Sequence, residues 1–97
     1  MGERVVIGPG SVPRLAPHMR LRFDKARDSW TIQAPERSFQ LDQIAHVIVS
    51  RCDGVASIEK IVESLCAEFA GAPRGQIETD VLALIQGFVN KSVMVQA

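Results

Sequence analysis

Two stretches near the start of the chain alternate hydrophobic and polar residues. MRLRFD at 19–24 places an apolar side chain at every second position, and WTIQA at 30–34 does the same. This period of two is typical of a strand with one buried face. The polar segment DKARDS at 24–29 lies between them, so the pattern predicts a β-hairpin.

A third short strand is predicted at RSFQL, residues 37–41, with Phe39 and Leu41 on one face. Pro35 separates it from the hairpin, because proline has no N–H to donate to a strand ladder. The three strands predict a single antiparallel sheet, with residues 37–41 at its edge.

The pattern then changes to the helical period. Asp42 is expected to cap a first helix, and Gly54 to end it in the left-handed conformation that glycine tolerates. The inner stripe predicted for this helix is Ile44, Val47, Ile48 and Cys52. Cys52-Asp53-Gly54 is therefore interpreted as a corner between helices and not as a reactive site.

Ser57 is expected to cap a second helix, and a third helix is predicted from about residue 76 to 91. The inner stripe of the second consists of Ile58, Ile61, Val62, Leu65, Cys66 and Phe69, and that of the third of Ile77, Val81, Leu84, Ile85 and Phe88. Leu82 and Val89 widen the apolar arc of the third helix to roughly 160°. Either the domain covers this helix on two sides, with the tail VMVQA as one candidate cover, or one flank is left for a partner.

The predicted fold class is α+β, a winged helix-turn-helix-like arrangement with a three-stranded antiparallel sheet followed by three helices. Residues 1–18 hold three of the five prolines and little periodicity, which predicts a flexible N-terminal arm. Residues 19–97 would form one domain, since 97 residues suffice for only one core. No stretch has the length of a membrane span or the character of a signal peptide, so a cytoplasmic location is expected.

Charge is balanced, with eleven basic and eleven acidic residues, but it is unevenly spread. Residues 1–37 carry a net charge of +3 and residues 38–97 a net charge of −3. Solvated faces that pair with one another are one explanation. A winged-helix DNA-binding regulator is the alternative function, but Glu78 and Asp80 near the start of the third helix would repel DNA phosphates. We expect no affinity for nucleic acid.

The residues that carry chemistry form no catalytic or metal-binding motif. Cys52 and Cys66 lie fourteen positions apart and are expected to be buried, unreactive thiols. His18 is placed in the arm and His46 on the outer face of the first helix, both in solvent. No catalytic residue, metal or cofactor is predicted, and the chain is not expected to be an enzyme.

Several short stretches of the chain together carry a family resemblance: Pro13-Arg14-Leu15, RLRFD (20–24), Trp30, APER (34–37), Leu41, RCDG (51–54), Ser57, Ile61, Leu65, Asp80-Val81 and Phe88. They resemble the PqqD family, the D proteins of pyrroloquinoline quinone (PQQ) biosynthesis, which are recognition elements for ribosomally made and modified peptides. The chain departs from the family at Ser92, where a glycine is common. The resemblance implies a peptide chaperone that binds the precursor peptide PqqA and presents it to the radical S-adenosylmethionine enzyme PqqE.

In related recognition domains, a leader peptide adds as a strand in a cleft beside the third helix. The residues expected to bind the peptide here are Arg37, Ser38, Phe39, Gln40 and Leu41 on the edge strand, with Leu82, Ile85 and Val89 as an apolar floor. Arg20 or Arg22 could join Arg37 in attracting acidic residues of the peptide. An exposed strand edge could also pair two copies of the chain as a homodimer.

Overall fold

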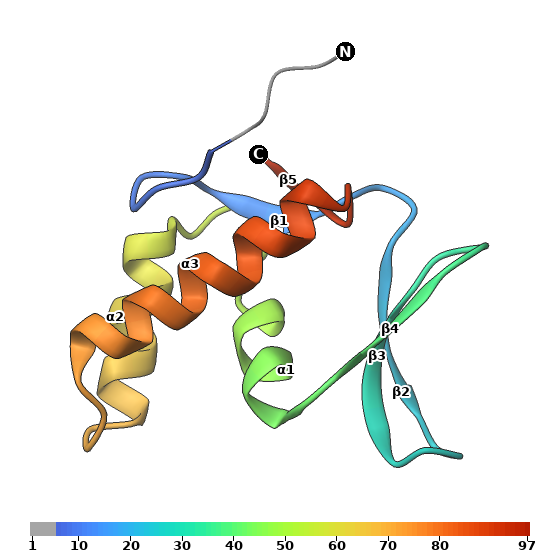
Figure 1. Ribbon diagram of the computed structural model, residues 1–97, viewed down its shortest axis with the longest axis horizontal. Helices are drawn as coiled ribbons and strands as arrows, with labels where there is room; N and C mark the ends of the chain where they lie inside the picture. The colour runs from blue at the N-terminus through green and yellow to red at the C-terminus, as the bar shows by residue number, and fades with distance from the viewer. Residues whose placement is uncertain (1–5) are drawn as a thin grey trace.

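The computed structural model describes residues 6–97. Its elements in chain order are β1 (Pro13–Leu15), β2 (Arg20–Asp24), β3 (Ser29–Gln33), β4 (Ser38–Leu41), α1 (Gln43–Ser50), α2 (Ile58–Glu68), α3 (Arg74–Asn90) and β5 (Met94–Gln96). The sheet of β2, β3 and β4 lies at one side of the molecule, and α1 stands between it and the pair α2 and α3 (Figure 1). The predicted α+β class, with three antiparallel strands followed by three helices, is confirmed.

The three-stranded sheet has the order β2-β3-β4 and is antiparallel throughout. Ile32 lies opposite Phe39, and Trp30 opposite Leu41. These four side chains therefore share the face that looks toward α1, as their alternation predicted. β2 and β4 are the two edges of this sheet.

Both predicted helix caps are present. The Asp42 carboxylate accepts a hydrogen bond from the Ala45 N–H at 2.7 Å, and the Ser57 hydroxyl accepts one from the Lys60 N–H at 3.2 Å. The expected end of the first helix is wrong, because α1 stops at Ser50. Gly54 has the expected positive φ, +81°, but it belongs to the connection that follows α1.

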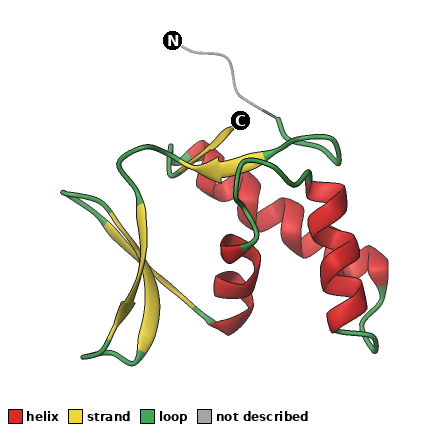
Figure 2. Ribbon diagram, turned by 180° about the vertical axis from the view of Figure 1, so that it is seen from behind, coloured by secondary structure: helices red, strands yellow, loops and turns green. Residues whose placement is uncertain are grey.

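The sequence predicted a flexible arm at residues 1–18. Residues 1–5 lie outside the described part, but residues 6–18 include the strand β1 and are hydrogen-bonded to the rest of the domain. β1 pairs antiparallel with β5, the C-terminal strand (Figure 2). The carbonyls of Pro9 and Ser11 accept hydrogen bonds from the Glu59 and Ile58 N–H groups at 2.9 and 2.8 Å. The first amides of a helix have no partner within the helix. The N-terminal segment supplies acceptors for two of them in α2, which orders this part of the chain.

The core draws on the sheet, all three helices and the C-terminal strand. Its most deeply buried side chains include Ile32, Leu41, Ile48, Val49, Ile58, Ile61, Val62, Leu65, Val81, Ile85, Val93 and Met94. The chain ends beside its N-terminal segment, where the Ala97 N–H donates to the Val12 carbonyl at 2.7 Å. Within residues 6–97, no helix has the length and apolar character to cross a membrane.

Candidate functional site

The open edge of β4 lies next to the C-terminal end of α3. The Phe39 ring meets the Phe88 ring edge to face, with 6.1 Å between their centroids. The Lys91 ammonium lies 5.7 Å from the centre of the Phe39 ring. The Arg37 guanidinium donates a hydrogen bond to the Lys91 carbonyl at 3.1 Å. These contacts fix the end of α3 against the start of β4.

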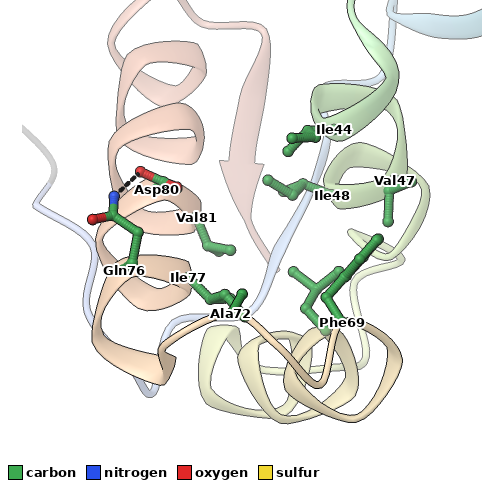
Figure 3. Close-up of a pocket in the computed structure, with 10 residues that line it drawn as sticks. Ile44, Val47, Ile48, Phe69, Ala72, Gln76, Ile77, Asp80 and Val81 are labelled. Carbon is green, nitrogen blue, oxygen red and sulfur yellow. Dashed lines mark hydrogen bonds between the residues drawn. The ribbon is translucent and has the colours of Figure 1, made fainter.

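A separate apolar groove of about 190 Å³ lies between α1 and the N-terminal half of α3. Ile44, Val47 and Ile48 line it from α1; Leu65, Phe69 and Ala72 from α2 and the following turn; and Gln76, Ile77, Asp80 and Val81 from α3. In Figure 3 the side chains of Ile44 and Ile48 point across the groove toward Ile77 and Val81. The Gln76 amide donates to the Asp80 carboxylate at 2.9 Å, at the rim.

Two side chains of the groove are exposed although the sequence predicted them to face the core. Ile44 is 66% exposed and Phe69 is 44% exposed. Ile44 is the second residue of α1, and Phe69 lies just past the last residue of α2, so both are at helix ends where neighbouring elements leave them exposed. Exposed apolar side chains that cluster around a groove are typical of a surface that receives a partner.

One stripe of α3 joins the groove to β4. Ile77, Leu84 and Lys91 are spaced by seven residues, so they lie on nearly the same side of the helix. Ile77 lines the groove, and Lys91 contacts Phe39. Leu84 lies between them and is half-buried. The surface formed by the β4 edge, this stripe and the groove is called the β4–α3 surface below.

The three residues predicted to form an apolar floor do not lie together beside β4. Ile85 lies in the core, and Leu82 and Val89 lie on the opposite flank of α3. Ile85 is fully buried in the core and has no surface to offer a peptide. Leu82 lies about 160° around the helix from Leu84. It shares its flank with Gln86, whose side-chain oxygen accepts from the Ile7 N–H at 3.0 Å. Leu82 therefore lies on the side of the N-terminal segment.

Val89, three residues beyond Gln86, belongs to that same flank. On the sheet, Arg20 and Arg22 lie on β2, the edge opposite to β4. The structure thus brings together Arg37, Phe39 and α3, but it does not bring Val89, Arg20 or Arg22 to the β4 edge.

The remaining residues predicted on β4 contribute mainly their backbone. Leu41 is 5% exposed and belongs to the core. Ser38 and Gln40 alternate with Phe39 and point to the outer face of the sheet. The Gln40 amide donates there to the Ser29 hydroxyl at 3.2 Å. A partner at this edge would meet main-chain groups of β4 and the side chain of Phe39.

The sequence predicted His46 on the outer face of the first helix, but in the structure it faces the sheet. Its ring stacks on Trp30 at a centroid distance of 4.3 Å and an angle of 8°, and Trp30 meets Phe23 edge to face at 5.5 Å. This stack joins α1 to the sheet. The helical period alone could not reveal it, because the period does not show which side of α1 the sheet covers.

The corner residues have the chemistry of a structural turn. Burial, and secondarily the charge of Asp53, raise the pKa of the Cys52 thiol to about 12, so it is protonated at neutral pH. The Asp53 carboxylate accepts from the Ala56 and Val55 N–H groups at 2.9 Å, and these hydrogen bonds lower its pKa. In residues 6–97, no group of three histidine, cysteine or acidic side chains is placed to hold a metal ion.

The chain is similar in sequence to proteins of one known family. The family model described as "Coenzyme PQQ synthesis protein D (PqqD)" matches residues 29–93. A PqqA binding protein of Rhodopseudomonas palustris strain BisB5 is 38% identical over 98% of this chain and 92% of its own. A PqqA binding protein of Xanthomonas campestris pv. campestris strain 8004 is 46% identical over 80% of this chain and 84% of its own.

Two solved structures are also similar. One is the solution structure of the PqqD truncation of Methylobacterium extorquens PqqCD, described as a functional and stand-alone recognition element for ribosomally synthesised and post-translationally modified peptides. It is 33% identical, with a TM-score of 0.78 over 93% of this chain and 95% of that one. The other is the crystal structure of PqqD from Xanthomonas campestris, 42% identical, with a TM-score of 0.56 over 91% of this chain and 97% of that one.

Proposed function

Because the chain belongs to the PqqD family, we propose that it binds the precursor peptide PqqA in the cytoplasm and presents it to PqqE in PQQ biosynthesis. The relatives are named as PqqA binding proteins, and the similar solution structure is a peptide-recognition element. The observation that carries the proposal is the β4–α3 surface, where an open strand edge packs against the end of α3 and the other half of the same helix lines an apolar groove.

The peptide binds along β4 as an added strand. An edge strand has N–H and C=O groups on its outer side without a neighbouring strand, and a peptide in extended conformation pairs with them. These main-chain hydrogen bonds depend little on the peptide's sequence. They supply the part of the affinity that any extended segment would gain.

The groove supplies selectivity. Alternate side chains of an added strand point to the same face, so those directed inward meet Phe39, Leu84 and the groove around Ile44 and Ile77. Full burial of one large apolar side chain stabilises a complex by roughly 1.5–3 kcal/mol. The volume of about 190 Å³ suits one or two such side chains. The preferred peptide therefore carries apolar residues at alternating positions.

The protein acts on the peptide by binding and not by catalysis. The Cys52 thiol is buried and protonated, and the His46 ring is stacked on Trp30. Neither is a nucleophile beside a positioned base. A strand held only at the β4 edge leaves the rest of the peptide outside the domain, which supports its presentation to a modifying enzyme.

A pair of leucines on α3 tests which flank receives the peptide. Leu84 and Leu82 are both half-buried and two residues apart, on opposite flanks. Leu84→Ala should weaken PqqA binding by about tenfold, from the loss of roughly 1.4 kcal/mol of apolar contact. Leu82→Ala should leave the dissociation constant unchanged. Calorimetric titration with synthetic PqqA measures both, and thermal unfolding checks that both variants are folded.

Presentation is tested separately by size-exclusion chromatography of this protein with PqqA and PqqE. One complex that contains all three components is expected.

The two experiments can fail separately. Equal loss of PqqA affinity in the two leucine variants would contradict the binding surface. Displacement of PqqA by PqqE would contradict presentation while leaving peptide binding intact.

A further inference from the structure

The outer face of the three-stranded sheet carries a second concave surface. Arg20 and Arg22 alternate along β2 and project from this face, opposite Gln33 and Thr31 of β3. An open recess of about 390 Å³ lies here, and its polar side chains are those of Arg20, Arg22, Gln33 and His18. The remaining lining is supplied by two prolines and an alanine.

Arg20 and Arg22 give the recess a positive charge, and no carboxylate lines it to offset them. Arg27 is paired with Asp24 at 3.9 Å, and Arg51 is paired with Glu68. Over residues 6–97 the structure records no such partner for Arg20 or Arg22, and both residues are exposed. Two guanidinium groups on neighbouring same-face positions are thus available to an anionic ligand.

The backbone beside this recess is also open. β2 is the edge of the sheet opposite to β4, so its outer N–H and C=O groups have no neighbouring strand within the described chain. Arg20 and Arg22 are two residues apart, which corresponds to roughly 6.8 Å along the strand. Acidic side chains at alternate positions of an extended segment have the same repeat.

We propose that the β2 edge and its recess bind an acidic extended segment of a partner protein, with carboxylates of that segment paired to Arg20 and Arg22. Charge complementarity favours this occupant. Duplex DNA requires neutralisation of more phosphates than two arginines supply. The site lies on the edge opposite to the β4–α3 surface, so a partner can bind here while β4 holds a peptide.

The probe for this site is an end-capped, fluorescein-labelled octapeptide that alternates glutamate and threonine. Fluorescence anisotropy should show saturable binding that weakens as salt is raised. Arg20→Gln with Arg22→Gln should weaken it by about tenfold or more, because two charge-assisted contacts are lost. The matched control, Lys25→Gln with Arg27→Gln, removes the same charge from the β2–β3 turn and should change the affinity less than about twofold. Circular dichroism establishes that both double variants are folded.

Several results would overturn the proposal. Equal weakening in both double variants would show an effect of net charge alone, and unchanged binding of an octapeptide with glutamine in place of glutamate would exclude carboxylate recognition.

The position of the probe is read from NMR amide shifts of the isotope-labelled protein. These shifts should cluster at 17–22 and 33–35; shifts confined to β4 and α3 would place the probe elsewhere. Arginine-dependent binding of random duplex DNA at physiological salt would assign the recess to nucleic acid. Self-association abolished by the Arg20 and Arg22 changes, seen by sedimentation, would assign it to a second copy.

Discussion

Replacing Ile44 with alanine should weaken PqqA binding while leaving the fold nearly unchanged. Ile44 is 66% exposed at the mouth of the groove, so its side chain contributes little to the core. A peptide in the β4–α3 surface would cover it. The substitution therefore separates binding from stability more cleanly than any change at the buried neighbour Ile48.

The size of the effect follows from the exposed fraction. Burial of a whole isoleucine side chain stabilises by roughly 1.5–3 kcal/mol, and the two-thirds of Ile44 that is exposed would contribute about 1–2 kcal/mol when a peptide covers it. The dissociation constant should rise about 5- to 30-fold. The fold loses less than about 1 kcal/mol, and the higher helix propensity of alanine offsets part of that loss.

Anisotropy titration of labelled PqqA gives the affinity, and urea unfolding gives the stability. Val55→Ala is the matched control, because Val55 is 82% exposed in the connection between α1 and α2 and does not line the groove. Its affinity should equal that of the unchanged protein. An Ile44→Ala variant that binds PqqA as tightly as the Val55→Ala variant would refute the assignment of the groove to the peptide.

Three further predictions concern the corner after α1. Gly54→Ala should lower the free energy of unfolding by about 1 kcal/mol or more, which urea unfolding measures. The reasons are that φ at Gly54 is +81° and that the added methyl group would meet the Arg14 side chain at 3.3–3.4 Å. Cys52→Ala should cost on the order of 1 kcal/mol in stability and leave PqqA affinity unchanged in the same anisotropy assay. The lowered pKa of Asp53 predicts a stabilising contribution that is present above its ordinary pKa of 3.8 and is lost as the pH falls through the folded-state pKa. Asp53→Asn should therefore flatten the acid limb of a plot of stability against pH; an unchanged limb would contradict this.

The elements that local sequence determines were predicted well. Alternation over five or six residues identifies the sheet because the side-chain period reports directly which face is buried. The caps at Asp42 and Ser57 are equally local, since each involves an amide three residues away. β1 and β5 were not predicted, because each has three residues and its partner lies at the other end of the chain.

The candidate site was harder to predict for a related reason. A helical pattern identifies an apolar arc, but it does not show which element covers each flank. Ile44 has core-like spacing and is exposed, whereas Ile85 was assigned to a binding surface and is fully buried. Only the three-dimensional position of α3 between β4 and the N-terminal segment separates the Leu84 flank from the Leu82 flank.

Hydrogen exchange measured with and without PqqA tests the central proposal most directly, because it reports on the backbone of β4 itself. Addition of the peptide should slow exchange at alternate amides between Ser38 and Leu41, where outward N–H groups gain a strand partner. Amides of β2 should exchange at the same rate in both states. Protection confined to β2 or to residues 6–18, with β4 unchanged, would contradict strand addition at the β4–α3 surface even if PqqA bound tightly.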